Sequence, residues 1–237
     1  MRLLPVATEG ELAREAADLV AQALRRRPDA ALVCATGRTP LGAYAELARR
    51  RLDPGRARVF QLDGYLGVAD DDPRSLYGWL DRALLAPLGI APGQVVRLRE
   101  DTPEPEAECA RYEAAAAQAG GWDLAVLGLG PNGHLGFNEP PSPPDAPTRV
   151  VTLSPESLRS NRAYFPPAYP VPERAMTAGM RLILGARRIL LLVSGERKRA
   201  ILRRVLDGPP TPWLPASYLA THRDAWIIAD RAALGPE

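Results

Sequence analysis

The apolar positions of the chain follow two patterns that alternate along the sequence. Short continuous apolar runs at 30–35, 122–130 and 187–195 are typical of strands buried on both faces of a parallel sheet. Between them, residues 10–27 and 105–120 carry apolar side chains three and four positions apart, which predicts amphipathic helices. Strands that alternate with helices predict an α/β fold with a mainly parallel central sheet.

The rest of the chain continues this alternation. We expect further strands at 57–63, 149–153 and 224–230, and further helices at 40–51, 73–88 and 196–208. Because Pro40 suits the first turn of a helix, we expect Thr39 to be the N-cap residue. No repeat or low-complexity linker interrupts the pattern, and we therefore predict a single domain over residues 1–237.

Composition and charge narrow the class of protein. A hydrophobic content of 46% over 237 residues is enough for a sizeable core. The formal net charge of +2 gives no reason to expect a nucleic acid or a membrane as partner. The apolar runs are too short to span a bilayer and the N-terminus does not resemble a signal peptide, so we expect a cytoplasmic protein. Cys34 and Cys109 lack metal-ligand spacing, which predicts buried or idle thiols rather than a disulfide.

Polar residues follow several predicted strands, and in parallel sheets ligands bind beyond the carboxyl ends of the strands. Thr36, Gly37, Arg38 and Thr39 lie between a strand and a helix. Free N–H groups, two hydroxyls and the positive end of a helix dipole favour a phosphate at this turn. The alternative is an ordinary strand-to-helix connection.

Lys198 is the single lysine of the chain and falls in the first turn of a predicted helix. A cation is unfavourable beside a helix N-terminus. An anion shared between the ammonium and the helix dipole would explain the position, whereas the alternative is a solvated surface lysine. Its position and its uniqueness together favour phosphate binding.

Two further strand ends carry candidate acid–base groups. Asp63 ends a strand and can act as a general base, the alternative being an Asp-Gly turn in solvent. Asn132, His134 and Glu139 follow the strand at 122–130. A neutral imidazole exchanges protons near pH 7 and Glu139 can hold its tautomer, unless the histidine only bonds loop carbonyls. No Ser or Cys nucleophile accompanies it, so we expect proton transfer on a small phosphorylated, hydroxyl-rich substrate, with neither metal nor cofactor.

Six segments together resemble the glucosamine-6-phosphate deaminase family: ATGRTPLGAY, LDGYLG, LGLGPNGHLGFNEP, TRVVTL, SGERKRA and PASYLATH, in this order over nearly the whole chain. The run G-H-x-x-F-N-E-P is specific, because the sister family of 6-phosphogluconolactonases shares the glycine–histidine pair but lacks the continuation. The resemblance implies a single Rossmann-like three-layer α/β domain. It also implies conversion of glucosamine 6-phosphate and water into fructose 6-phosphate and ammonia, a step of amino-sugar catabolism.

The resemblance also implies roles for individual residues. His134 would assist opening of the pyranose ring, with Glu139 tuning it. Asp63 would be the base that moves the proton from C2 towards C1. The residues at 36–39 would hold the phosphate together with Lys198.

Several positions depart from the family pattern. Gly64 stands where deaminases commonly carry glutamate. Asn132 stands where some members carry aspartate and others asparagine, so it can serve as a hydrogen-bonding orienter. The segment NRAYF places Arg162 one position earlier than the family's phosphate-binding arginine, which on a helix rotates it by about 100°; Arg38 could compensate. Val151 replaces a basic residue of the allosteric members, so we expect no activation by N-acetylglucosamine 6-phosphate.

Two alternatives to this function stay open. One is an enzyme for a neighbouring substrate, either another amino-sugar phosphate such as galactosamine 6-phosphate or 6-phosphogluconolactone. The other is a non-catalytic sugar-phosphate sensor, like those of some transcription regulators. Such regulators carry a helix-turn-helix, for which we expect no room because we expect the fold to begin within the helix at 10–27. Related enzymes occur as monomers and as hexamers, so a homo-oligomer also stays open.

Overall fold

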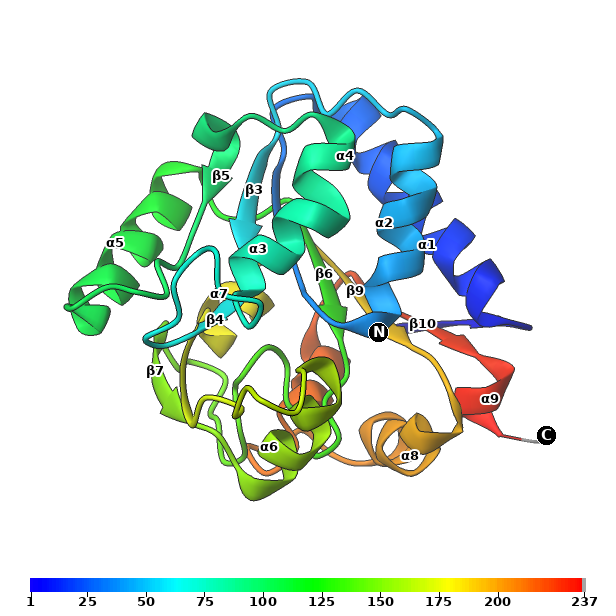
Figure 1. Cartoon of the computed structure of the whole chain (residues 1–237). Coiled ribbons are helices and arrows are strands. Elements are labelled where there is room, and N and C mark those ends of the chain that lie inside the picture. Colours follow the sequence, from blue (N-terminus) through cyan, green and yellow to red (C-terminus); the bar gives the residue numbers. More distant parts are fainter. Residues whose placement is uncertain (236–237) are drawn as a thin grey trace.

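A parallel β-sheet forms the centre of the computed structural model, which describes residues 1–235 (Figure 1). Within that range the strand order is β1-β10-β9-β6-β2-β3-β5, and all neighbouring strands pair in parallel. The strands are β1 (Arg2–Val6), β2 (Ala31–Cys34), β3 (Arg58–Gln61), β5 (Val95–Val96), β6 (Leu124–Gly128), β9 (Arg188–Val193) and β10 (Ala225–Asp230). The predicted α/β class with a mainly parallel central sheet is therefore confirmed.

Helices cover both faces of this sheet (Figure 1). The α-helices of the described residues are α1 (Glu9–Arg26), α2 (Arg38–Arg49), α3 (Leu76–Leu80), α4 (Ala86–Leu88), α5 (Pro105–Gln118), α6 (Pro155–Asn161), α7 (Met180–Leu184), α8 (Arg199–Asp207) and α9 (Arg231–Leu234). Between α3 and α4 lies a π-helical segment, η1 (Asp81–Leu85). The 3-10 turns are η2 (Pro92–Gln94), η3 (Arg162–Tyr164), η4 (Glu196–Lys198) and η5 (Pro215–Thr221).

Alternate residues of the central strands face two separate hydrophobic cores. In β2, Val33 packs into the core that includes α5, α7 and α8, whereas Leu32 and Cys34 pack into the core that includes α1 and α2. Because both faces are covered, these strands are continuous apolar runs in the sequence. Cys34 and Cys109 are buried and free, which confirms the expectation of buried thiols. Among residues 1–235, no helix has the length and apolar character needed to cross a membrane.

A second, antiparallel sheet lies apart from the central one and corrects part of the predicted strand set. It contains β4 (Asp63–Tyr65), β8 (Arg174–Thr177) and β7 (Arg149–Thr152) in that order. The strand predicted at 149–153 is therefore real, but it does not belong to the parallel sheet. The strand predicted at 57–63 divides into β3 and β4, so Asp63 begins a strand of the second sheet.

Two boundaries also differ from the prediction. The fold begins with β1, which pairs with β10 at the sheet edge, and not within the first helix. Pro5 is compatible with that position because an edge strand has one side without pairing. Helix α2 begins at Arg38 with Gly37 as its N-cap residue, so Thr39 is not the N-cap. Gly37 adopts a φ of 104°, which the side chain of a threonine disfavours.

Candidate active site

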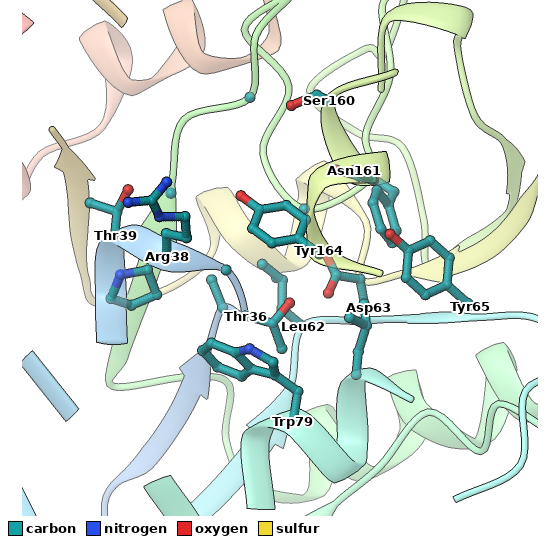
Figure 2. A pocket seen from close by; sticks show the side chains of 18 of the residues that line it. Thr36, Arg38, Thr39, Leu62, Asp63, Tyr65, Trp79, Ser160, Asn161 and Tyr164 are labelled. Carbon is teal, nitrogen blue, oxygen red and sulfur yellow. The ribbon is translucent and has the colours of Figure 1, made fainter. Parts of the chain in front are cut away.

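The carboxyl ends of four neighbouring strands, β9, β6, β2 and β3, meet at one edge of the central sheet. From β2 the chain runs outward to β3 and β5, and it later returns to the other side of β2 with β6. Such a reversal leaves a crevice between the two central strands, where α/β sheets bind ligands. A cavity of about 210 Å³ lies there, lined by residues 36–40, Asp63, His134 and Lys198 among others (Figure 2). Segments far apart in the sequence therefore converge as predicted from their strand ends.

The turn at 36–39 forms one wall of the cavity. No side-chain hydrogen bond caps the N-terminus of α2 among the described residues, so its first N–H groups remain available to a ligand. A helix N-terminus with free N–H groups favours an anion. Figure 2 shows Arg38 and Thr39 side by side at this wall.

Lys198 lines the same cavity and lies in η4, the 3-10 turn that follows β9. Its Nζ donates a 2.6 Å hydrogen bond to the main-chain oxygen of Leu129, just beyond the end of β6. Burial lowers the pKa of this ammonium, while the charge of Glu156 opposes the shift. A half-buried ammonium with one hydrogen bond made and donors to spare suits an anionic ligand.

Asp63 lies in the cavity wall with its carboxylate buried. Its Oδ1 is buried and has no hydrogen-bond partner among the described residues. Burial raises the pKa of the carboxyl to about 7. A carboxylate that titrates near neutral pH and has a free oxygen is suited to take a proton from carbon or oxygen.

His134, Glu139 and Asn132 form one hydrogen-bonded group after β6. His134 Nδ1 lies 3.5 Å from Glu139 Oε2, and Asn132 Nδ2 donates to that oxygen at 2.6 Å. Asn132 Oδ1 in turn accepts from the main-chain N–H of His134 at 3.2 Å. Burial tends to raise the pKa of Glu139, but hydrogen bonds from His134, Ser157 and Asn132 lower it to about 2. Glu139 is therefore an ionised acceptor that orients the imidazole.

The serine at 157 was not expected from the sequence. Ser157 Oγ lies 3.4 Å from His134 Nδ1, and α6 presents it there because Ser154 caps that helix. Since Glu139 and Ser157 both face Nδ1, the other ring nitrogen of His134 is left for the cavity. Only the segment SPES, a helix start with serine at its third helical position, hints at this residue in the sequence.

Arg162 is not among the described residues that line the cavity. Its Nη1 donates to the main-chain oxygens of Phe165, Pro166 and Tyr169 at 3.1–3.2 Å. The side chain therefore ties down the segment that follows η3, so the structure does not support the expectation that it reaches a phosphate. The physical reason is that Arg162 lies beyond the end of α6, in the 3-10 turn η3, where three main-chain oxygens satisfy its guanidinium.

Several aromatic and polar lining residues were missed by sequence reasoning, namely Tyr65, Trp79, Asn161 and Tyr164. Figure 2 shows Asp63, Tyr65, Asn161 and Tyr164 together at one side of the cavity. The Tyr65 ring packs 5.3 Å from Phe137 and 5.6 Å from Phe165, centroid to centroid. An aromatic or amide side chain in a strand or helix carries no local signal of facing a cavity, so the sequence pattern does not reveal them.

The chain has clear relatives. It matches the family model described as glucosamine-6-phosphate isomerases/6-phosphogluconolactonase over residues 5–228. The glucosamine-6-phosphate deaminase of Geobacillus sp. (strain WCH70) is 37% identical over 238 residues, covering 99% of this chain and 95% of that protein. Glucosamine-6-phosphate deaminase 1 of Bacillus subtilis (strain 168) is 36% identical, with 98% of each protein covered. A solved structure described as a monomeric glucosamine-6-phosphate deaminase has a TM-score of 0.96 and 36% identity, covering 99% of this chain and 100% of the other.

Proposed function

The chain belongs to the family of glucosamine-6-phosphate isomerases and 6-phosphogluconolactonases, and we infer that it is a glucosamine-6-phosphate deaminase. It converts glucosamine 6-phosphate and water into fructose 6-phosphate and ammonia. One observation carries the mechanism: the buried Asp63 carboxylate, with a free oxygen, opens into the same cavity as the anion-binding turn of α2.

The phosphate of the substrate is assigned to the wall formed by residues 36–39. The N–H groups at the start of α2 and the hydroxyls of Thr36 and Thr39 donate to its oxygens, and the ammonium of Lys198 balances its charge. Arg38 adds a second cation. Arg162 has no part in this assignment, because its guanidinium is engaged with main-chain oxygens.

Ring opening is assigned to His134. Opening of the pyranose removes a proton from O1 and adds one to O5, which an imidazole can mediate through a single nitrogen. Glu139 holds Nδ1 so that the other nitrogen faces the sugar. Asn132 and Ser157 keep that carboxylate and ring in place.

Isomerisation is assigned to Asp63. Its carboxylate takes the proton from C2 of the open-chain sugar, and the C–H electron pair forms the C1–C2 double bond. The aldehyde oxygen gains its proton from the ammonium group on C2, which becomes the neutral amine of the enolamine. Return of the proton to C1 leaves an iminium at C2. Water adds to that carbon and ammonia departs, which leaves the C2 ketone of fructose 6-phosphate.

The other proposed properties rest on similarity. Residues 1–237 are proposed to act as one catalytic unit in the cytoplasm, where sugar phosphates are made and consumed. A monomer is the assembly we propose, since a relative with 36% identity and a TM-score of 0.96 is described as monomeric.

The decisive experiment is an assay of product formation. Purified protein is incubated with glucosamine 6-phosphate, and fructose 6-phosphate and ammonia are measured in parallel. We expect the two products in equal amounts, and loss of both in Asp63→Asn. Binding without turnover would favour the sensor, and turnover confined to galactosamine 6-phosphate or 6-phosphogluconolactone would favour a neighbouring enzyme; each of these results would overturn the proposal.

A further inference from the structure

Position 64, next to the proposed base, has no room for a side chain. Its backbone conformation would allow residues other than glycine. Gly64 lies in the short strand β4, and its φ is outside the left-handed region. A Cβ added to Gly64 would lie 2.6 Å from Glu100 Cγ and 3.0 Å from both Glu100 Oε1 and Gln61 Nε2. The side chain of Glu100 therefore fills the volume that any other residue at position 64 would need.

Glu100 is a fully buried carboxylate without an arginine or lysine partner in the described part of the chain. Its Oε1 accepts from Gln61 Nε2 at 2.7 Å and from the main-chain N–H of Tyr77 at 2.9 Å. Its Oε2 faces the N–H of Leu76 at 3.3 Å. A buried acid is costly unless its oxygens are satisfied, and here two chain segments satisfy them.

The first of these segments carries the base. Gln61 Nε2 donates one proton to Glu100 and the other to the main-chain oxygen of Asp63 at 2.9 Å. Both protons of the amide are thus committed, which fixes the position of the Asp63 peptide relative to Glu100.

The second segment is the start of α3, which also contributes residues to the cavity. Leu76 and Trp79 of this helix line the cavity, as does its N-cap residue Ser75. Glu100 itself is not among the described lining residues. It therefore touches the strand that carries Asp63 and the helix end that carries lining residues, without access to a substrate.

We propose that Glu100 is a positioning residue for the general base: it sets the distance between the Asp63 strand and α3, and position 64 is glycine because Glu100 occupies its side-chain space. This inference rests on the proposed deaminase function. The competing explanation is that Glu100 only stabilises the fold, and kinetics separates the two.

The first experiment compares Glu100→Ala with Glu100→Gln in protein shown to be folded by circular dichroism. Misplacement of a base lowers kcat, and we expect a loss of tenfold or more in Glu100→Ala. KM should change by less than about threefold, because the phosphate-binding wall is not touched. Glu100→Gln keeps one acceptor oxygen and should retain more kcat than Glu100→Ala. A folded Glu100→Ala variant with wild-type kcat would overturn the inference.

A matched control removes another carboxylate that accepts a main-chain N–H. Asp123 Oδ2 accepts from the N–H of Ala31 at 2.9 Å, and the carboxylate also pairs with Arg27 and Arg187 at the amino ends of the strands, away from the cavity. Asp123→Ala should lower the midpoint of thermal unfolding without lowering kcat. An equal loss of kcat in this variant would show that general destabilisation, not positioning, explains the effect.

The second experiment tests the shared space directly. Gly64→Ala alone should displace Glu100 and lower kcat. In a Glu100→Ala background the same change should lower kcat little further, because the methyl group then enters the volume that Glu100 has vacated. Gly64→Glu combined with Glu100→Ala should recover part of the lost kcat by returning a carboxylate to Gln61. Additive losses would contradict the shared-space argument. Absence of turnover in the wild-type enzyme would instead refute the proposed function, so the two failures are distinguishable.

Discussion

The ammonium of Lys198 donates a 2.6 Å hydrogen bond to the main-chain oxygen of Leu129, so the only lysine of the chain joins the ends of two neighbouring strands at the cavity wall. This contact fixes one proton of the ammonium and leaves the others for a ligand. An ammonium can direct its donors both to Leu129 and to a ligand, whereas the planar guanidinium of an arginine holds its donors in a fixed fork. This difference explains why the residue is lysine and not arginine.

Replacement of Lys198 by alanine should therefore weaken substrate binding. A charged hydrogen bond is worth roughly 1.5–3 kcal/mol, so KM should rise about ten- to a hundredfold while kcat changes less. The measurement is steady-state kinetics with glucosamine 6-phosphate. Arg203→Ala is the control, since Arg203 lies on the exposed side of α8 and should leave KM unchanged. An unchanged KM in Lys198→Ala would mean that the phosphate lies elsewhere.

Asp63→Asn should lower activity and, above about pH 4, raise stability relative to the wild type. A general base contributes about 10²- to 10⁴-fold, and the variant should lose kcat on that scale. Burial raises the pKa of Asp63 to about 7 in the folded protein, whereas an unfolded aspartate titrates near pH 3.9. The folded state thus binds the proton more tightly, and the wild type loses stability relative to the variant as pH rises from about 4 to about 7.

Urea unfolding of wild type and Asp63→Asn at pH 5 and pH 8 measures this effect. The free energy of unfolding of the variant, relative to the wild type, should be higher at pH 8 than at pH 5, on the order of a few kcal/mol at most. A difference that does not change with pH would mean that Asp63 is not buried as the structure shows. This test needs no substrate, so titration of the phosphate does not affect it.

Much of this site could be predicted because its residues follow strands whose pattern is unambiguous. The apolar runs before Thr36, Asn132 and Ser194 are continuous, and parallel strands bring their carboxyl ends to one edge. Asp63 lines the cavity, consistent with its predicted place at the end of a strand, although the prediction attached it to the parallel sheet. The turn from β3 to β4 takes only one residue, Leu62, and leaves no signal in the pattern.

The rest could not be predicted because it depends on contacts between distant residues. Glu100 comes 36 positions after Gly64, and nothing near either residue indicates that they share one volume. The direction of Arg162 depends on the 3-10 turn η3 and on three carbonyls that follow it. The raised pKa of Asp63 likewise comes from burial, which only the packed structure reveals.

Gly130→Ala should impair catalysis through His134. A Cβ at Gly130 would lie 2.1–2.5 Å from three atoms of the imidazole, so the ring must move away from its position beside Glu139. We expect kcat to fall by tenfold or more, since a shift of about 1 Å is enough for such a loss. Steady-state kinetics checks this. Gly93→Ala is the control: a Cβ at Gly93 has no heavy atom within 4 Å, and its kcat should stay at the wild-type value.

Arg162→Ala should affect a chain segment and not the phosphate site. The guanidinium holds the main-chain oxygens of Phe165, Pro166 and Tyr169, so its loss should loosen residues 165–169 and speed their proteolysis. Inhibition by inorganic phosphate isolates the anion site from the rest of the substrate. Its inhibition constant should change by less than about twofold in Arg162→Ala but should rise in Lys198→Ala. Arg159→Ala, an exposed arginine of α6, should alter neither property. A matching rise in the inhibition constant of Arg162→Ala would mean that this side chain turns into the cavity when phosphate binds.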